Sequence, residues 1–282
     1  MTDTRGLRAG AWNHTTHPDF YDYYANASQS AATAGRFGRV QAMVLRVAAQ
    51  RGLSGALDVA DIGCGAGTQC RMWAERGHRV FGIDVSEPLV ELARQRAREQ
   101  GVEARFEVGS ATALPWADNS MDVCLMPELL EHVVDWQSCI MEAARVLRPG
   151  GLFYLSTTNV LCPRQDEYNL PLYSWYPAAL KRHYERAAVT TKPQVANYAT
   201  YPAVNWFSYY RLRDFLTPLG FLCLDRFDLI DLDGKGRLAG AVVRLVREVR
   251  LLRLLGHVAT PGTRLLAVKH AATAANRVEA AA

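Results

Sequence analysis

Between residues 57 and 157, short apolar runs alternate with longer amphipathic segments. We expect the apolar runs to be strands: LDVADI (57–62), RVFGID (79–84), ARFEVG (104–109), MDVCLM (121–126) and GLFYLST (151–157). The helical segments between them cover 67–76, 87–100, 128–133 and 137–147. Strands separated by helices in this way are typical of βαβ units. The pattern therefore predicts an α/β fold built on a parallel sheet.

The segments on either side of this region complete the expected fold. Residues 36–52 have the apolar spacing of a helix that ends at Gly52. Two apolar runs near the other end, 221–230 and 263–271, are compatible with an antiparallel pair of strands. Between strand five and this pair, residues 158–210 are irregular and rich in aromatic side chains and proline, as in a functional lid or insertion.

Three glycines, Gly63, Gly65 and Gly67, follow the first predicted strand in the stretch VADIGCGAGT (59–68). Glycine lets the backbone turn sharply and approach a ligand without a side-chain clash. The next predicted strand ends at Asp84, where a carboxylate can accept hydrogen bonds from both hydroxyls of a ribose. A strand, a glycine turn, a helix and an acid after the next strand predict a nucleoside-binding site.

Asp61 stands two residues before the first glycine and restricts the kind of nucleoside. A pyrophosphate would meet its like charge, at a cost of about 1 to 4 kcal/mol at about 4 Å. The turn also reads GxGxG, with Thr68 where the dinucleotide fingerprint GxGxxG has its third glycine. S-adenosylmethionine has no phosphate and carries an ammonium and a sulfonium group. Asp61 therefore favours it over a nicotinamide dinucleotide, and with it a methyltransferase over an oxidoreductase.

Four stretches between about 57 and 159 carry a family resemblance: VADIGCGAGT, VFGIDVSEPLVELAR, VGSATALPWADNSMDVCLMPELLEHVVDW and EAARVLRPGGLFYLSTTN. By these, the chain resembles a class I S-adenosylmethionine-dependent methyltransferase and is similar to the group that includes the O-methyltransferases of coenzyme Q synthesis. The resemblance implies a Rossmann-like seven-stranded sheet, mostly parallel with an antiparallel last strand and flanked by helices. The expected fold also has an N-terminal lid and an aromatic insertion after strand five. The reaction would convert S-adenosylmethionine into S-adenosylhomocysteine.

The resemblance also implies which residues bind the cofactor, and the sequence pattern indicates how the chain is divided. The cofactor-binding residues would be Arg36, Asp61, Gly63, Cys64, Gly65, Gly67, Asp84, Val85, Ser110, Ala111 and Met126. Ser110 is a departure, since relatives usually have an aspartate there, and Arg36 could equally be a solvated residue at a helix start. The expected parts are an N-terminal lid and helix (1–52), an S-adenosylmethionine-binding core (53–160), a substrate-binding insertion (161–219) and a C-terminal strand pair with a basic amphipathic helix (220–282).

The stretch MPELLEHVVDW follows the fourth predicted strand, where the chemistry of such a fold takes place. Glu128 and Glu131, three residues apart on an expected helix, would share a face next to His132. Three interpretations stay open. His132 is a general base for a hydroxyl acceptor, the three side chains hold a divalent metal, or the motif is a packing feature of the cofactor loop. Packing is the most favoured of the three and metal the least, so no metal ligand is assigned.

Substrate contacts are expected from two aromatic-rich segments, since aromatic rings can cover a hydrophobic or ring-shaped acceptor. The candidates are His14, His17, Tyr21 and Tyr24 near the N-terminus, and Tyr173, Trp175, Tyr176, Tyr201, Trp206 and Tyr210 in the insertion. Packing of these aromatics onto the sheet is the alternative. The loop after strand four has Met-Pro-Glu-Leu in place of the Asn/Asp-Pro-Pro-Tyr of adenine N-methyltransferases, so the sequence favours a small molecule over a nucleic acid.

The expected reaction is therefore methyl transfer from S-adenosylmethionine to a small molecule, with O-methylation of a phenol, a sugar hydroxyl or a lipid-linked intermediate favoured. The alternatives are N- or C-methylation, or a non-catalytic protein that binds S-adenosylmethionine.

Residues 237–255, RLAGAVVRLVREVRLLRLL, form an expected amphipathic helix with Arg244, Arg247, Arg250 and Arg253 at intervals of three. Such a helix can lie on an anionic membrane, or it can pack over the last two strands or against a partner subunit, so the protein is expected as a monomer or homodimer. The N-terminus lacks the apolar run of a signal peptide. Six scattered cysteines are expected as free, mostly buried thiols. Both features predict a cytoplasmic protein, with peripheral membrane contact through 237–255 as an option.

Overall fold

The computed structural model describes residues 28–196 and 202–270. In this part of the chain seven strands form one sheet in the order β3–β2–β1–β4–β5–β7–β6. The strands are β1 (Asp58–Ile62), β2 (Arg79–Asp84), β3 (Arg105–Val108), β4 (Met121–Pro127), β5 (Leu147–Thr158), β6 (Phe221–Asp225) and β7 (Gly262–Lys269). Strands β1 to β5 pair in parallel, whereas β7 is antiparallel to both β5 and β6. This confirms the predicted Rossmann-like sheet with its antiparallel C-terminal pair.

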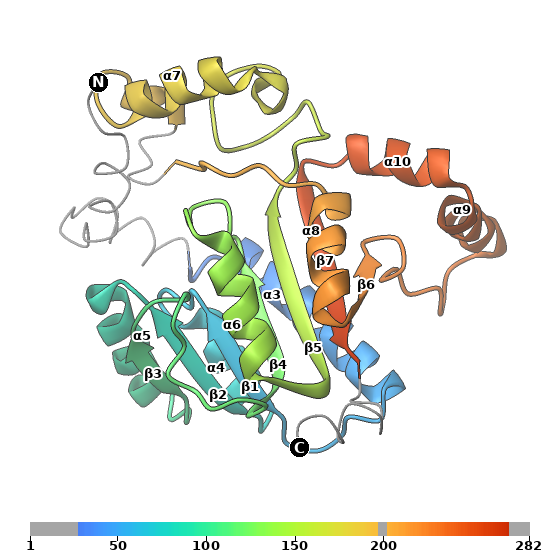
Figure 1. Ribbon diagram of the computed structural model, residues 1–282. Coiled ribbons are helices and arrows are strands. Elements are labelled where there is room, and N and C mark those ends of the chain that lie inside the picture. Colours follow the sequence, from blue (N-terminus) through green and yellow to red (C-terminus); the bar gives the residue numbers. More distant parts are fainter. Residues whose placement is uncertain (1–27, 197–201, 271–282) are drawn as a thin grey trace, which may run out of the picture.

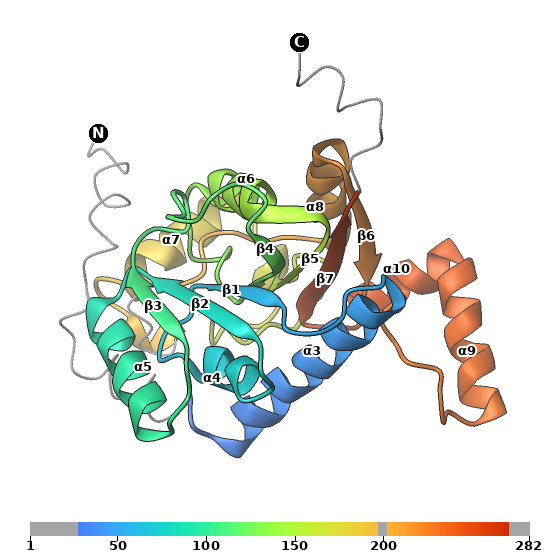
Figure 2. The same cartoon turned by 90° about the horizontal axis from the view of Figure 1, so that it is seen from below.

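Helices cover both faces of the sheet (Figures 1 and 2). One face carries α3 (Ala31–Gln50), α4 (Thr68–Ala74) and α5 (Glu87–Glu99), and the other carries α6 (Trp136–Val146) and α8 (Tyr209–Leu216). The remaining elements are α7 (Ala178–Ala188), α9 (Arg237–Glu248), α10 (Arg250–Val258) and the short 3₁₀ turns η2 (Tyr173–Trp175), η3 (Pro193–Ala196) and η4 (Thr217–Leu219). The core is therefore a three-layer sandwich whose ligand edge is at the carboxyl ends of the parallel strands.

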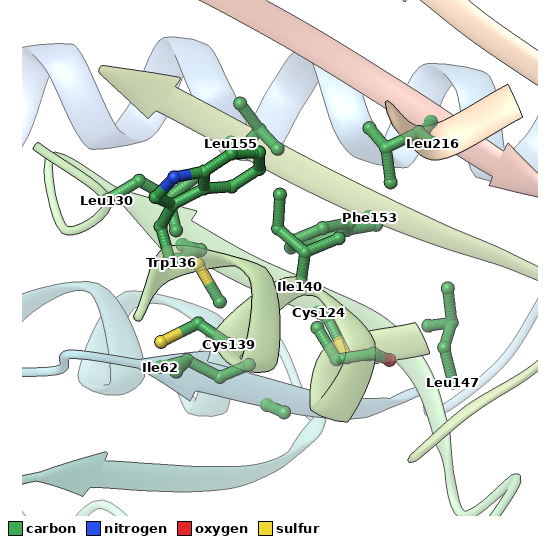
Figure 3. Packing of buried hydrophobic residues seen from close by; sticks show 14 of the residues in the cluster. Ile62, Cys124, Leu130, Trp136, Cys139, Ile140, Leu147, Phe153, Leu155 and Leu216 are labelled. Atoms are coloured by element: carbon green, nitrogen blue, oxygen red, sulfur yellow. Dashed lines mark hydrogen bonds between the residues drawn. The ribbon is translucent and has the colours of Figure 1, made fainter. Parts of the chain in front are cut away.

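The helix α6 shows how the sequence pattern builds this sandwich. Its Asp135 cap accepts a hydrogen bond from the amide of Ser138, and its apolar residues recur at helical spacing. Figure 3 shows Trp136, Cys139 and Ile140 of this helix packed against side chains of β4 and β5. Full burial of each large apolar side chain is worth about 1.5 to 3 kcal/mol, so this face fixes the helix on the sheet.

The predicted helix over 128–133 is wrong, because the segment is a series of turns. Glu128 has a left-handed backbone, with φ of 53°, and its amide donates to the carbonyl oxygen of Ser156 at 2.8 Å. The carbonyl oxygen of Glu131 accepts hydrogen bonds from the amides of Val204 and Asn205, at 2.9 and 3.0 Å. Bonds to distant segments replace the local bonds that a helix requires.

Two other expected elements differ from the structure. The strand predicted over 221–230 ends at Asp225, because the carboxylate of Asp225 accepts hydrogen bonds from the amides of Phe227 and Asp228 and turns the chain. The single helix predicted over 237–255 is broken at Val249, which has an extended backbone between α9 and α10. The six cysteines are free thiols as predicted, five of them buried and Cys223 half-buried.

No helix in 28–196 or 202–270 combines the length and the apolar content that spanning a bilayer requires.

Candidate active site

The glycine turn connects β1 to α4 and is tied to the end of β2. The amides of Gly63 and Cys64 donate to the carbonyl oxygen of Ile83, at 2.8 and 3.0 Å. Gly67 has φ of 71°, and a Cβ atom there would lie 2.7 Å from the side chain of Ala93. By contrast, no atom lies within 4 Å of the position of a Cβ on Gly65. Gly67 is thus required by packing, and Gly65 leaves open space beside the turn.

Asp61 is buried beneath this turn. Its carboxylate accepts hydrogen bonds from Nε2 of Gln69 and from Sγ of Cys70, both at 3.2 Å, and both donors come from α4. Burial raises the pKa of Asp61 to about 7, and the nearby charge of Asp84 acts in the same direction. A cation bound at the turn would favour the ionised carboxylate, whereas an anion would oppose it.

Asp84 lies at the end of β2 and faces the turn. Its Oδ2 accepts a hydrogen bond from the amide of Gly65 and its Oδ1 accepts one from the amide of Ser86, both at 2.9 Å. The amide of Val85 also interacts with this carboxylate, which keeps acceptor capacity for a ribose hydroxyl. Burial raises the pKa of Asp84. The amide of Gly109 donates to the carbonyl oxygen of Asp84 at 2.9 Å, which brings the segment that begins at Ser110 next to it.

These residues fit an adenosine cofactor that carries a positive charge. The turn offers open space at Gly65, a carboxylate with free acceptor sites at Asp84 and a second carboxylate at Asp61. The other predicted cofactor residues lie as follows. Val85 and Ser110 are exposed, Cys64 is buried beside the turn, Ala111 packs against the core, Met126 is fully buried, and Arg36 is exposed at the start of α3. Their contacts with a cofactor stay predictions.

A polar pocket of about 270 Å³ lies at the carboxyl ends of β4 and β5, beside the start of α3 and of β7. Its lining residues are Arg36, Phe37, Val40, Pro127, Glu128, Tyr154, Ser156, Thr157, Thr158, Gln165, Asp166, Glu167, Arg226, Pro261, Gly262, Thr263 and Arg264. The loop that contributes Pro127 and Glu128 also reaches the glycine turn, because a Cβ on Gly63 would lie 3.1 Å from the side chain of Leu129. The pocket is thus connected to the cofactor turn through one loop.

The three residues of the predicted ExxEH motif have separate environments. Glu128 lines the pocket, and its Oε1 accepts a hydrogen bond of 2.5 Å from Oγ of Ser156. Glu131 is fully buried, accepts a hydrogen bond from Thr157 at 2.9 Å and has a pKa raised far above its usual value by burial. His132 is half-buried in the turn and does not line the pocket. Across the described residues, no three His, Cys, Asp or Glu side chains are arranged to hold a metal ion.

Glu167 is a titratable residue of the pocket that the sequence analysis missed. Burial raises its pKa to about 7, with the charges of Glu128 and Asp166 acting in the same direction. A carboxylate with such a pKa is suited to accept a proton near neutral pH. The acidic pair Asp166–Glu167 was visible in the sequence, but nothing local indicated that the insertion folds back over β5.

Arg226 and Arg264 are two further pocket residues without a sequence signal. Neither they nor Arg36 forms an ion pair with another residue of the described ranges. Burial lowers the pKa of Arg226, and the charge of Arg264 adds to this effect. The pocket thus combines carboxylates with guanidinium groups that have no ion-pair partner among the described residues, an arrangement that can bind an oxygen as it loses its proton.

Five predicted substrate aromatics of the insertion lie in the described part of the chain, and none of these five lines the pocket. Tyr173 is fully buried and, with Trp206, belongs to a separate apolar cluster of the insertion, where the two rings are 5.5 Å apart. Tyr176 packs on this cluster, Trp175 is 54% exposed, and Tyr210 packs against the ring of His257. Their contacts with substrate stay predictions. His14, His17, Tyr21, Tyr24 and Tyr201 lie outside the described residues.

The comparisons with known proteins agree with this geometry. Residues 60–155 match the family described as "Methyltransferase domain". The ubiquinone biosynthesis O-methyltransferase of Chelativorans sp. is 39% identical over 103 residues, which are 36% of this chain and 41% of that protein. The protein of the same name from Agrobacterium fabrum is 40% identical over 111 residues, which are 39% of this chain and 44% of that protein. The chain thus spans about two fifths of the length of these relatives.

A solved structure of an S-adenosylmethionine-dependent methyltransferase from Methanosarcina mazei shares the fold, with a TM-score of 0.50 and 24% identity. The superposition covers 78% of this chain and 95% of that chain. The family match also supports S-adenosylmethionine as the cofactor. Residues 60–155 therefore match a methyltransferase domain, and the predicted resemblance to class I S-adenosylmethionine-dependent methyltransferases of the ubiquinone O-methyltransferase kind is confirmed.

Proposed function

We propose that this protein transfers the methyl group of S-adenosylmethionine to a hydroxyl oxygen of a small molecule bound in the polar pocket. The observation that carries this proposal is the position of the pocket, on the same loop after β4 that contacts the glycine turn. An acceptor there would lie beside the cofactor, as an in-line displacement requires. A phenol, a sugar hydroxyl or a lipid-linked intermediate would each suit the reaction, and the named relatives are O-methyltransferases.

The bound cofactor would supply a methyl group already activated by its sulfonium. The protein's own groups then have two tasks. Glu167 accepts the proton that the acceptor hydroxyl loses, because its pKa of about 7 lies near neutral pH. Arg226 and Arg264 favour the developing negative charge on that oxygen, since neither is paired with a carboxylate in the described ranges. Glu128 and His132 remain alternative proton acceptors.

The insertion (161–219) is proposed to close the acceptor site, because its residues Gln165 and Glu167 line the pocket. Residues 1–52 are proposed to form an N-terminal lid and helix, and residues 53–160 to bind S-adenosylmethionine. A cytoplasmic location is supported by the six free thiols, since an oxidising compartment would favour disulfides.

A screen of hydroxyl compounds with methyl-labelled S-adenosylmethionine and the purified full chain tests the proposal. We expect label in a phenol, sugar or lipid-linked acceptor, and a turnover about 100-fold lower or more in Glu167→Gln. Glu103→Gln serves as the matched control, because Glu103 is exposed in the loop before β3 and does not line the pocket. Cofactor affinity should be alike in all three proteins.

Two outcomes would redirect the assignment. Labelled nitrogen or carbon products would support N- or C-methylation, and cofactor binding without transfer to any acceptor would support a non-catalytic binding protein. For His132→Ala, lower turnover with unchanged cofactor affinity would support a base, whereas wild-type turnover would assign His132 to packing.

A further inference from the structure

The helices α9 and α10, here called the α9–α10 arm (237–258), expose their apolar side chains. Leu238 is 81% exposed, Leu251 is 63% exposed and Leu245 is 54% exposed, and Val242 and Leu255 are each 53% exposed. On each helix these residues recur at helical spacing along one face, and the two exposed apolar faces are here together called the apolar stripe. Figure 2 shows α9 standing apart from the sheet. Several large apolar side chains exposed on neighbouring helices indicate an interaction site.

Three polar side chains of the arm face the protein body. The guanidinium of Arg247 donates to the carbonyl oxygens of Phe227 and Ile230, at 2.9 and 2.7 Å. Arg253 forms an ion pair with Asp228. Nε2 of the buried His257 lies 3.0 Å from Oδ2 of Asp225. Surface helices usually bury their apolar stripe, whereas this arm exposes its apolar side chains and turns Arg247, Arg253 and His257 toward the protein body.

This orientation is fixed at the second end of the arm as well. The side-chain amide of Asn159 donates to the carbonyl oxygens of His257 and Thr260, at 2.8 and 2.7 Å. Gly256 lies against the ring of Phe227 so closely that a Cβ on it would be 2.3 Å from a ring carbon. Turning the apolar stripe inward would break these contacts, so the stripe needs another cover.

The charge of the arm indicates which kind of partner covers the apolar stripe. Residues 237–258 contain five arginines, and Glu248 is their single acidic residue. Arg237, Arg244 and Arg250 are exposed and form no ion pair within the described part of the chain. A second copy docked on this stripe would bring two positively charged arms together. An anionic phospholipid surface would pair with the arginines and accept the leucines and valines.

We propose that the α9–α10 arm is a membrane-binding element that lies in the headgroup region of an anionic phospholipid bilayer. The segments before and after the arm contribute Arg226 and Pro261 to the lining of the polar pocket. Membrane binding through the arm does not depend on the methyl-transfer proposal, because it requires neither cofactor nor acceptor.

Flotation of the purified full chain with phospholipid vesicles tests this proposal. Vesicles of phosphatidylcholine with about a third phosphatidylglycerol are compared with pure phosphatidylcholine vesicles, and we expect the protein to float with the anionic vesicles. A Leu238→Ser/Leu245→Ser/Leu251→Ser variant should bind at least about tenfold more weakly, because these side chains no longer enter the bilayer. The control Met141→Ser/Leu180→Ser/Val189→Ser changes side chains that are 47, 40 and 53% exposed on other surfaces and should bind like the wild type.

A second variant tests the contribution of the exposed arginines to membrane binding. Neutralising the exposed arginines as Arg237→Gln/Arg244→Gln/Arg250→Gln should also weaken binding to anionic vesicles at least about tenfold, since each cation near such a surface contributes roughly a fivefold factor. Arg51→Gln/Arg76→Gln/Arg98→Gln is the matched control. Circular dichroism checks that all variants are folded.

Three results would overturn the proposal. They are no flotation of the wild type with anionic vesicles, equal losses in the arm and control variants, or a wild-type dimer that the serine variant converts to a monomer in analytical ultracentrifugation. The last result would assign the stripe to a second copy of the chain. Cofactor binding, measured in parallel, shows separately whether the methyltransferase site is intact.

Discussion

The protonation state of Asp61 yields a quantitative prediction for cofactor binding. In the ligand-free protein, burial raises the pKa of Asp61 to about 7, so the carboxyl is mostly protonated at pH 6. A cofactor with ammonium and sulfonium charges beside it favours the ionised form and lowers that pKa. Binding therefore releases a proton below pH 7, and S-adenosylmethionine should bind more tightly as the pH rises towards 7.

The size of this effect follows from linkage. If Asp61 is fully ionised in the complex, the apparent Kd falls about 16-fold between pH 5.5 and pH 7. This range lies below the titration of an α-amino group, near pH 7.7 to 8.0, so the cofactor itself stays charged. Isothermal titration calorimetry at pH 6, in two buffers of different ionisation enthalpy, should report release of about 0.9 proton per cofactor bound.

Two variants assign the effect to Asp61. Asp61→Asn should bind more weakly at pH 7 and show no pH dependence between pH 5.5 and 7. Glu167→Gln should keep the wild-type dependence, although the pKa of Glu167 is also raised to about 7, because Glu167 lines the acceptor pocket. A wild-type Kd that is constant over this range, with no proton released, would refute the reasoning that Asp61 selects a cationic ligand.

Three further changes have definite expected outcomes. Asp84→Ala should weaken binding of S-adenosylhomocysteine by about 1 to 3 kcal/mol in calorimetry, with the exposed Asp214→Ala as a neutral control. Gly67→Ala should lower the free energy of unfolding in urea by about 2 to 4 kcal/mol, against about 1 kcal/mol for Gly77→Ala, which has a similar φ of 81° but open space around it. Glu131→Gln should become more stable relative to the wild type as the pH rises from 5 to 8, because the buried carboxyl of Glu131 resists the ionisation that occurs in the unfolded chain above about pH 4.3. A stability difference that does not change with pH would contradict this role of Glu131.

The parts of the fold that depend on local pattern could be predicted from the sequence. β2 was predicted with its observed bounds, because its apolar run is flanked by turn residues and ends at an acid. The conformation of the loop 128–133 could not be predicted from the sequence. It depends on hydrogen bonds to Ser156, Val204 and Asn205, which are far away in the sequence. A local apolar pattern alone favours a helix there.

The candidate site divides in the same way. The glycine turn and Asp84 come from one contiguous βαβ unit, so the sequence indicated them together. The polar pocket draws Arg36 from α3, Glu167 from the insertion and Arg264 from β7, and only the tertiary fold brings these residues together. The exposure of the apolar stripe of the α9–α10 arm could not be predicted either, since the sequence shows an apolar stripe but not the direction in which it faces.

Calorimetric titration of the purified protein with S-adenosylhomocysteine and with NADH tests the central claim most directly. The site described here predicts that S-adenosylhomocysteine binds at one site per chain and that NADH does not bind, because the pyrophosphate of NADH would meet Asp61. Binding of NADH without binding of S-adenosylhomocysteine would contradict the account.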